Sequence, residues 1–325
     1  MESWQEIQNE IAAAGARKGI PGDHDAVRRE AYRRLSSLTG RPLIVYASAF
    51  HVPGKNELAA GTLLLDMSDK EGFQEAVRNI DGPAVDVWIH SPGGSAEAAE
   101  SIVGILRTKF EGVRFIVTGS AKSAATMLAM SGNRILMSDA AELGPTDPQL
   151  SLGDSRTAPA GAILGQFDRA KKEIVKNTAL IAPWLPILQQ YGPSLLLECQ
   201  NLLKLSEKLV AAWLEQYMFG GERTAQKKAR KLARYLANDR NFLSHGRRVG
   251  LNDLRTHGAI VDRIEEMPLE QQEAIARVHL AIMATLDDTA AVKIFENSSG
   301  AVLLRLVQTR AATQRSPEDA MHGQP

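Results

Sequence analysis

Short apolar runs alternate with amphipathic, helix-like segments from residue 41 to about residue 140. Runs of this length and composition are typical of β-strands, and they lie at 41–50, 84–90, 113–120 and 134–138. A parallel partner strand can be reached only through a crossover connection, so strands separated by helices call for a parallel sheet with helices on its faces. The alternation therefore predicts an α/β fold for this part of the chain.

The rest of the chain has a mainly helical pattern. Two helices are expected near the N-terminus, where they form a surface arm or pack on another subunit. A strand returns near residue 260, and a turn around residues 297–300 indicates a hairpin. The expected organisation is an N-terminal helical arm at 1–40, a core at 41–265 with a helical insertion at about 160–240, a C-terminal helix and hairpin at 266–310, and a disordered tail at 311–325.

Composition narrows the classes of function. The chain has 38 Lys and Arg and 38 Asp and Glu, so its formal net charge is zero and no nucleic-acid or anionic-membrane partner is expected. Cys199 is the only cysteine, which excludes an internal disulfide and a multi-cysteine metal site. We find neither a signal-peptide core at the start nor a run of about 18–20 apolar residues. A cytoplasmic protein without a membrane span is expected.

Two bends rich in small residues end two successive predicted strands. One reads HSPGGS at 90–95, and the other reads TGSAKSAAT at 118–126. Ligands of parallel sheets bind outside the carboxyl ends of the strands, where both bends fall. Gly93 and Gly94 allow close approach of the backbone, and a helix expected after each bend brings unpaired N–H groups to the same place. The pattern suits a serine nucleophile beside an oxyanion hole, or glycines and serines that only cap helices.

Three segments in order, HSPGG, GSAKSAATMLAMSGNRILM and LGPTDPQ, resemble the Clp-protease/crotonase superfamily. The likeness is greatest to the serine dehydrogenase proteinase family, which is related to signal peptide peptidase A. It covers residues 41–150 well and continues more weakly to about residue 265. The resemblance implies a Clp/crotonase-like parallel sheet with flanking helices and a helical extension.

The resemblance also implies the roles of several residues. Ser123 is the nucleophile, because AKSAAT falls where these peptidases carry theirs. The oxyanion hole falls at Gly93 and Gly94, with the N–H of Ala124 as a second donor. The GxSxG motif is absent, so the nucleophile elbow of α/β-hydrolases does not apply. His90 ends a predicted strand and is expected to pack beside the site.

The general base has two candidate positions. Signal peptide peptidases use a lysine further along the chain, which points to Lys171 or Lys172. His245 is preferred, because a neutral imidazole accepts a proton near pH 7 whereas a lysine first needs a lowered pKa. Asp147 either orients His245 or only forms a turn before the next proline.

The leading hypothesis is a serine endopeptidase that hydrolyses peptide bonds in a peptide or protein substrate, without a cofactor or metal. One alternative is a catalytically inactive Clp-fold binding or scaffold protein that has lost its base. Another is a crotonase-type enzyme that uses the same oxyanion hole for an acyl-CoA thioester. The resemblance further implies a homo-oligomer with the site near a subunit interface.

Overall fold

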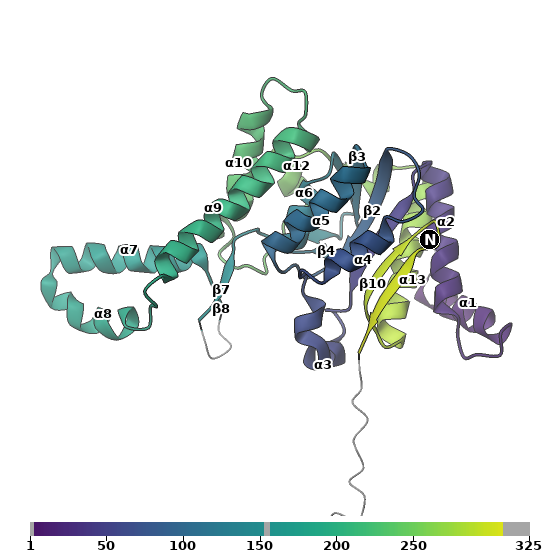
Figure 1. Cartoon of the computed structure of the whole chain (residues 1–325), viewed down its shortest axis with the longest axis horizontal. Helices are drawn as coiled ribbons and strands as arrows, with labels where there is room; N and C mark the ends of the chain where they lie inside the picture. The colour runs from purple at the N-terminus through teal and green to yellow at the C-terminus, as the bar shows by residue number, and fades with distance from the viewer. Residues whose placement is uncertain (1–2, 153–156, 308–325) are drawn as a thin grey trace, which may run out of the picture.

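The computed structural model describes residues 3–152 and 157–307. Its centre is a seven-stranded sheet in the order β11-β10-β1-β2-β3-β5-β9 (Figure 1). The five strands from β1 to β9 in this order are parallel, whereas β10 and β11 are antiparallel additions at one edge. The mostly parallel sheet with flanking helices confirms the predicted α/β class. Its strands are β1 (Leu43–Ser48), β2 (Ala84–His90), β3 (Gly112–Val117), β5 (Arg134–Met137), β9 (Val261–Arg263), β10 (Ala291–Asn297) and β11 (Val302–Leu306).

Strand β2 shows why these runs form the middle of a sheet. Val87 and Ile89 belong to the hydrophobic cluster on one face, and Trp88 belongs to the cluster on the other face. A strand that is buried on both faces reads as a nearly continuous apolar run. Asp86 interrupts that run, but its carboxylate is paired with Arg114 at 2.6 Å. The buried charge is therefore compensated, and the strand stays in the core.

The first face of the sheet carries the helices that follow the two small-residue bends. The helix after the first bend is α5 (Ala96–Lys109), and its N-cap Ser95 accepts a hydrogen bond from the Ala98 N–H at 3.0 Å. The helix after the second bend is α6 (Ala124–Met130), and all of its residues are buried. Also on this side are α4 (Asp69–Ala76), α9 (Leu195–Trp213) and α10 (Ala225–Ala237).

The opposite face is covered by α2 (His24–Thr39) and α13 (Leu269–Asp288), with α1 (Trp4–Ala16) packed against them (Figure 1). Tyr32 and Leu35 of α2 are fully buried in the cluster beneath the sheet. This differs from the prediction of a surface arm. The basic character of α2 concealed its role, because the long basic side chains cover its outer side while an apolar stripe faces the core.

A run of helices follows the short strands β7 (Gln149–Ser151) and β8 (Thr157–Pro159). It comprises α7 (Ala160–Lys176), α8 (Ile181–Leu188), α9 and α10. Figure 1 shows α7 and α8 projecting away from the sheet at the left, with α9 leading back to it. The remaining described elements are α3 (Pro53–Leu63), α11 (Asp239–Phe242), α12 (Leu251–Thr256) and the short strands β4 (Ser120–Ala121) and β6 (Glu142–Leu143), together with short 3-10 and π turns.

At the C-terminal end of the described chain, α13 is followed by β10 and β11, which pair antiparallel. The predicted disordered tail, 311–325, lies outside the described residues. Across the ranges that the structure covers, every helix falls short of the length or apolar character needed to cross a bilayer.

Candidate active site

Ser123, the predicted nucleophile, occupies a strained backbone position at the N-cap of α6. Its φ and ψ are 51° and −119°, a region that residues with a side chain rarely adopt. Such a conformation costs about 1–3 kcal/mol and persists only where the surrounding contacts enforce it. The side chain is partly exposed, while the next residue, Ala124, is buried. The strain therefore presents the Ser123 hydroxyl at the mouth of a pocket.

Backbone pairing between the two bends enforces this conformation. The Ser91 N–H donates to the Ser120 carbonyl, and the Lys122 N–H donates to the Ser91 carbonyl, both at 3.0 Å. On the other side of the bend, the Thr126 hydroxyl donates to the Ala121 carbonyl at 2.7 Å. The residues just before Ser123 are thus held from both sides.

Gly93 packs directly against the predicted nucleophile. A β-carbon at Gly93 would lie 2.3 Å from the Lys122 carbonyl oxygen and 2.7 Å from Ser123 Cβ, and its φ is +88°. Only glycine combines this left-handed conformation with so close an approach. The Gly93 N–H donates to the Ser91 hydroxyl at 3.2 Å. Gly93 therefore gives the bend its close packing, while its N–H is already engaged.

Gly94 is held by a short stretch of strand-like pairing with Leu65. The Leu65 N–H donates to the Gly93 carbonyl and the Ser95 N–H donates to the Leu65 carbonyl, both at 2.8 Å. In this pairing the Gly94 N–H points away from Leu65. Among residues 3–152 and 157–307, neither the Gly94 N–H nor the Ala124 N–H donates a hydrogen bond. Two unsatisfied donors thus flank Ser123.

His245 and Asp147 come together from segments far apart in the chain. His245 Nδ1 lies 2.9 Å from Asp147 Oδ1. The Asp147 side chain is only 1% exposed, whereas that of His245 is 28% exposed. The second carboxylate oxygen of Asp147 accepts a hydrogen bond from Gln149 at 2.7 Å. Sequence reasoning missed Gln149, which shares the DPQ segment with Asp147.

Four of the predicted residues line one pocket of about 490 Å³. They are Ser123, Gly94, Ala124 and His245, and Met127 of α6 with Leu202 and Leu205 of α9 add apolar side chains to the wall. No hydrogen bond joins the Ser123 hydroxyl to His245 in the part of the chain that the structure describes. The lining residues are Leu64, Pro92, Gly94, Ser95, Ala96, Glu97, Ser123, Ala124, Met127, Thr146, Pro148, Gln149, Thr157, Leu202, Leu205, Ser206 and His245.

The alternative bases and the neighbouring serine lie elsewhere. Lys171 and Lys172 are exposed on α7, and neither lines the pocket. The Ser120 hydroxyl donates to Glu142 at 3.0 Å, and Lys122 forms an ion pair with the same carboxylate at 2.9 Å. Both side chains therefore bind Glu142 of β6.

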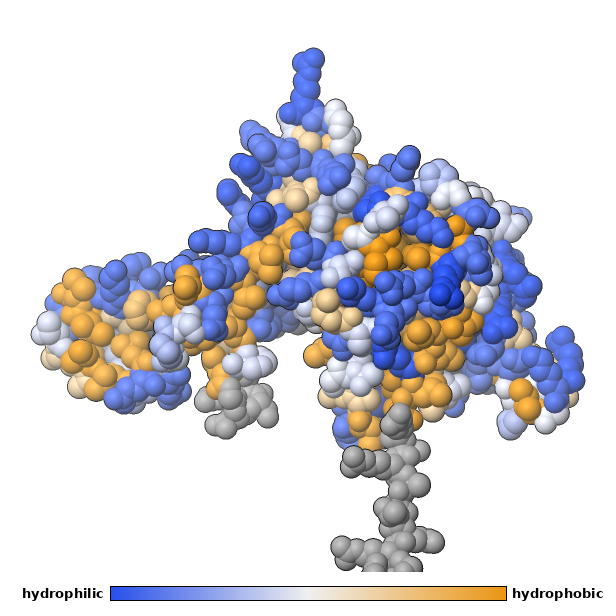
Figure 2. All heavy atoms as spheres, viewed as in Figure 1, coloured by the Kyte–Doolittle hydropathy of each residue, from blue (hydrophilic) through white to orange (hydrophobic). Residues whose placement is uncertain are grey.

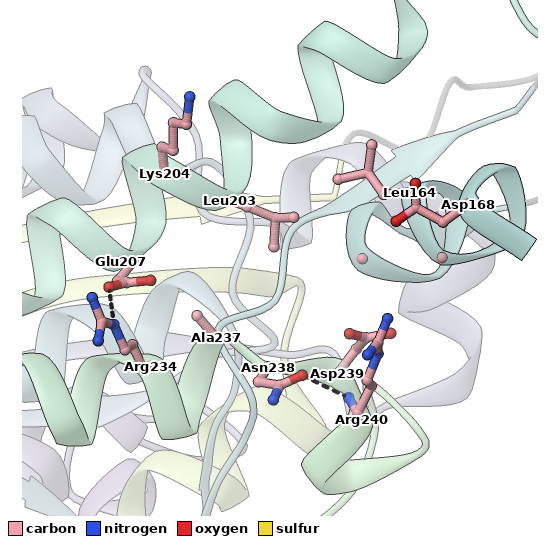
Figure 3. Close-up of a pocket in the computed structure, with 12 residues that line it drawn as sticks. Leu164, Asp168, Leu203, Lys204, Glu207, Arg234, Ala237, Asn238, Asp239 and Arg240 are labelled. Carbon is pink, nitrogen blue, oxygen red and sulfur yellow. Dashed lines mark hydrogen bonds and ion pairs between the residues drawn. The ribbon is translucent and has the colours of Figure 1, made fainter. Parts of the chain in front are cut away.

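A second pocket of about 440 Å³ lies between α7, α9 and the corner formed by α10 and α11 (Figure 3). Its wall is strongly charged, and Glu207 and Arg234 on it are ion-paired at 2.8 Å. No serine, cysteine or histidine is among its lining residues, so it offers no pair of nucleophile and base. Those residues are Gly161, Leu164, Gly165, Asp168, Leu203, Lys204, Glu207, Arg234, Ala237, Asn238, Asp239 and Arg240.

Residues 62–186 match the model of a protein family described as ClpP-like SDH-type serine proteinase. The resemblance to the serine dehydrogenase proteinase family is confirmed. The matched segment contains both bends, Ser123 and Asp147, whereas His245 lies beyond it.

Curated relatives and a solved structure are also similar. Two uncharacterized proteins of Methanocaldococcus jannaschii are 38% identical over 88 residues and 28% identical over 118 residues. These matches cover 26% and 36% of this chain and 30% and 39% of the relatives, so the chain spans about a third of their length. A mutant of the membrane-bound stomatin-specific protease 1510-N matches 61% of this chain and 75% of its own, with 16% identity and a TM-score of 0.37.

Proposed function

We propose that this protein is a serine endopeptidase in which Ser123 attacks the carbonyl carbon of a peptide bond. The observation that carries the proposal is the convergence in one pocket of Ser123, two free N–H donors and a histidine paired with a buried carboxylate. The family match to ClpP-like serine proteinases supports it independently.

Asp147 determines how His245 acts as the base. The Asp147 carboxylate can only accept a hydrogen bond, so a neutral His245 carries its proton on Nδ1, which faces that carboxylate. The lone pair on Nε2 is then free to take the proton of the Ser123 hydroxyl. His245 later returns this proton to the leaving amine, and Asp147 stabilises the imidazolium between the two steps. A general base contributes about 10²–10⁴ to the rate.

The Gly94 and Ala124 N–H groups bind the oxyanion of the tetrahedral intermediate. One such donor is worth about 10²–10³ in rate. We assign the hole to these two groups and give Gly93 a packing role, because its N–H already donates to Ser91. Met127, Leu202 and Leu205 on the pocket wall favour an apolar side chain of the substrate. No cofactor enters the mechanism.

Homo-oligomerisation and a cytoplasmic location belong to the same proposal. Apolar side chains exposed on the projecting α7 and α8 support assembly, among them Val175, Ile181 and Leu185 (Figure 2). The test is the mass of the purified protein in solution, and a monomer at micromolar concentration would contradict this part.

A fluorophosphonate probe tests the chemistry. The expected result is labelling of Ser123, located by mass spectrometry, and its loss in Ser123→Ala and His245→Ala. Ser120→Ala is the matched control and keeps the label, because the Ser120 hydroxyl is bound to Glu142. Labelling that persists in His245→Ala and disappears in Lys171→Ala or Lys172→Ala would show that this lysine is the general base instead of His245.

The second candidate is a Clp-fold binding protein. The absence of a hydrogen bond between Ser123 and His245 in the described residues favours it. A complete lack of labelling in the assembled protein, with peptide binding retained, would support this candidate and exclude the peptidase.

A further inference from the structure

A line of polar groups runs from the Ser123 bend to the surface near the end of α13. The Ser120 N–H donates to His90 Nδ1 at 3.3 Å. His90 Nε2 lies 3.3 Å from His51 Nδ1. His51 Nε2 in turn lies 3.2 Å from a carboxylate oxygen of Asp287. His90 is buried, whereas the side chains of His51 and Asp287 are 29% and 39% exposed. The proposed catalytic steps use none of these side chains.

Only one arrangement of protons satisfies this line. A backbone N–H can only donate, so His90 Nδ1 must carry a lone pair, and a neutral His90 then holds its proton on Nε2. That proton points at His51 Nδ1, which must accept it. His51 therefore holds its own proton on Nε2, toward the carboxylate of Asp287. The tautomer of His90 therefore depends on His51, and the tautomer of His51 depends on Asp287.

Packing keeps the His90 ring neutral and tight against the bend. Burial lowers the pKa of His90 to about 3, so the ring stays uncharged near neutral pH. Phe50 stacks on the ring with the centroids 4.7 Å apart. A β-carbon at Gly119 would lie 2.9 Å from His90 Nδ1. The ring thus has little room to move or flip.

Within the described part of the chain, no three His, Cys, Asp or Glu side chains are arranged to hold a metal ion. The 3.3 Å between His90 Nε2 and His51 Nδ1 is a hydrogen-bond distance.

We propose that His90 is a positioning residue for Ser123, and that Asp287, acting through His51, holds His90 in the tautomer that accepts from Ser120. This inference rests on the proposed function of Ser123. Ser120 lies three residues before Ser123, whose strained backbone is held by the contacts of the bend. A proton on His90 Nδ1 would set two donors against each other and push Ser120 away.

The groups that face the two rings determine the response to acid. His51 is faced by Asp287 from α13, Lys55 from α3 and His90 from β2, while His279 from α13 faces His90. A proton gained by His51 would make both of its nitrogens donors, and Nδ1 could no longer accept from His90. The line is therefore expected to break when His51 is protonated.

The tautomers can be measured without any catalytic assay. Nitrogen chemical shifts of the imidazoles in ¹⁵N-histidine-labelled full-length protein should show the His90 proton on Nε2 and a lone pair on Nδ1. The opposite tautomer of His90 would overturn the proposal, whether or not Ser123 is reactive.

Two variants of His51 test the link to the nucleophile. His51→Asn keeps an acceptor near the position of Nδ1, whereas His51→Lys offers only donors there. The rate of fluorophosphonate labelling at Ser123 should stay within about twofold in His51→Asn and fall about tenfold or more in His51→Lys. Equal rates in the two variants, both folded by thermal unfolding, would overturn the proposal.

Variants of His90 provide a second comparison. His90→Asn keeps an oxygen that can accept from the Ser120 N–H, and His90→Leu does not. Labelling should be faster in His90→Asn than in His90→Leu, and the reverse order contradicts the proposal. If the wild-type protein is not labelled at all, the proposed function fails. In that case the NMR chemical shift of the Ser120 amide still tests the proposal. It should differ between His51→Lys and the wild-type protein, and an unchanged chemical shift would overturn the proposal.

Discussion

Lys293 Nζ lies 2.7 Å from both carboxylate oxygens of Asp69, and both side chains are fully buried. The same ammonium donates to the Leu64 carbonyl at 2.7 Å. The next residue, Leu65, forms the backbone pairing that holds Gly94. The ion pair therefore connects β10, near the end of the described chain, to the segment behind the proposed oxyanion hole.

Lys293→Met should destabilise the protein strongly. Removal of the ammonium leaves Arg305 Nε, at 4.0 Å, as the charged group beside the buried Asp69 carboxylate, and loss of the close partner of a buried charge costs about 3–5 kcal/mol. Arg169→Met is the matched control, because it breaks the exposed pair with Glu173 and should change the free energy of unfolding far less. The free energy of unfolding from urea titration compares the two. Equal values would show that the buried pair adds nothing beyond an exposed one.

Gly94→Ala should abolish labelling of Ser123. The new methyl group would lie 2.1 Å from the Leu65 carbonyl oxygen, so the backbone that carries the Gly94 N–H must move. Gly104→Ala is the control. Gly104 lies inside α5 with nothing within 4 Å of its added β-carbon, and this change should stabilise the helix by about 0.5–1 kcal/mol. Normal labelling in a folded Gly94→Ala variant would remove Gly94 from the proposed site.

Asp147→Asn should reduce kcat for peptide cleavage by about 10³-fold or more, since the amide favours the wrong tautomer of the histidine. KM should change little, because the Asp147 side chain is buried behind His245 and does not line the pocket. Gln149→Ala removes hydrogen bonds to the second carboxylate oxygen and the backbone carbonyl of Asp147, together with part of the pocket wall. It leaves Asp147 Oδ1 beside His245 Nδ1 and should reduce kcat much less. Similar losses in both variants would argue that Asp147 acts through packing alone.

Stability should fall with acidification in a way that depends on His90. Burial lowers the pKa of His90 to about 3, below the value of the unfolded chain. The unfolded state therefore binds more protons between about pH 6.5 and pH 3, so this stabilising contribution is present above pH 6.5 and is lost as the pH falls. The loss at pH 5 amounts to about 2 kcal/mol for this group. Urea titrations at pH 8 and pH 5 should show a smaller difference in His90→Asn than in the wild-type protein, and an equal difference would contradict the assignment.

The pattern of apolar and small residues along the chain is enough to predict much of the fold. The run at 84–90 was predicted as a strand and is β2, because a parallel strand buried on both faces must be apolar throughout. The bends were predictable for a similar reason. Small residues are needed where two bends pack closely, and a β-carbon at Gly93 would lie 2.7 Å from Ser123 Cβ. A surface arm was predicted for residues 1–40, but Tyr32 and Leu35 are core residues, since a helix hides its apolar stripe among basic side chains.

The sequence by itself determined the α/β class, the alternating elements, the small-residue bends and a serine at the start of α6, because these depend on neighbours along the chain. Only the tertiary structure decided which distant groups meet. It brings His245 to Asp147 across 98 residues, leaves Lys171 and Lys172 exposed on α7, and joins His51 and His90 beside Asp287. Such contacts depend on how separate elements pack, and no local spacing of residues carries that information.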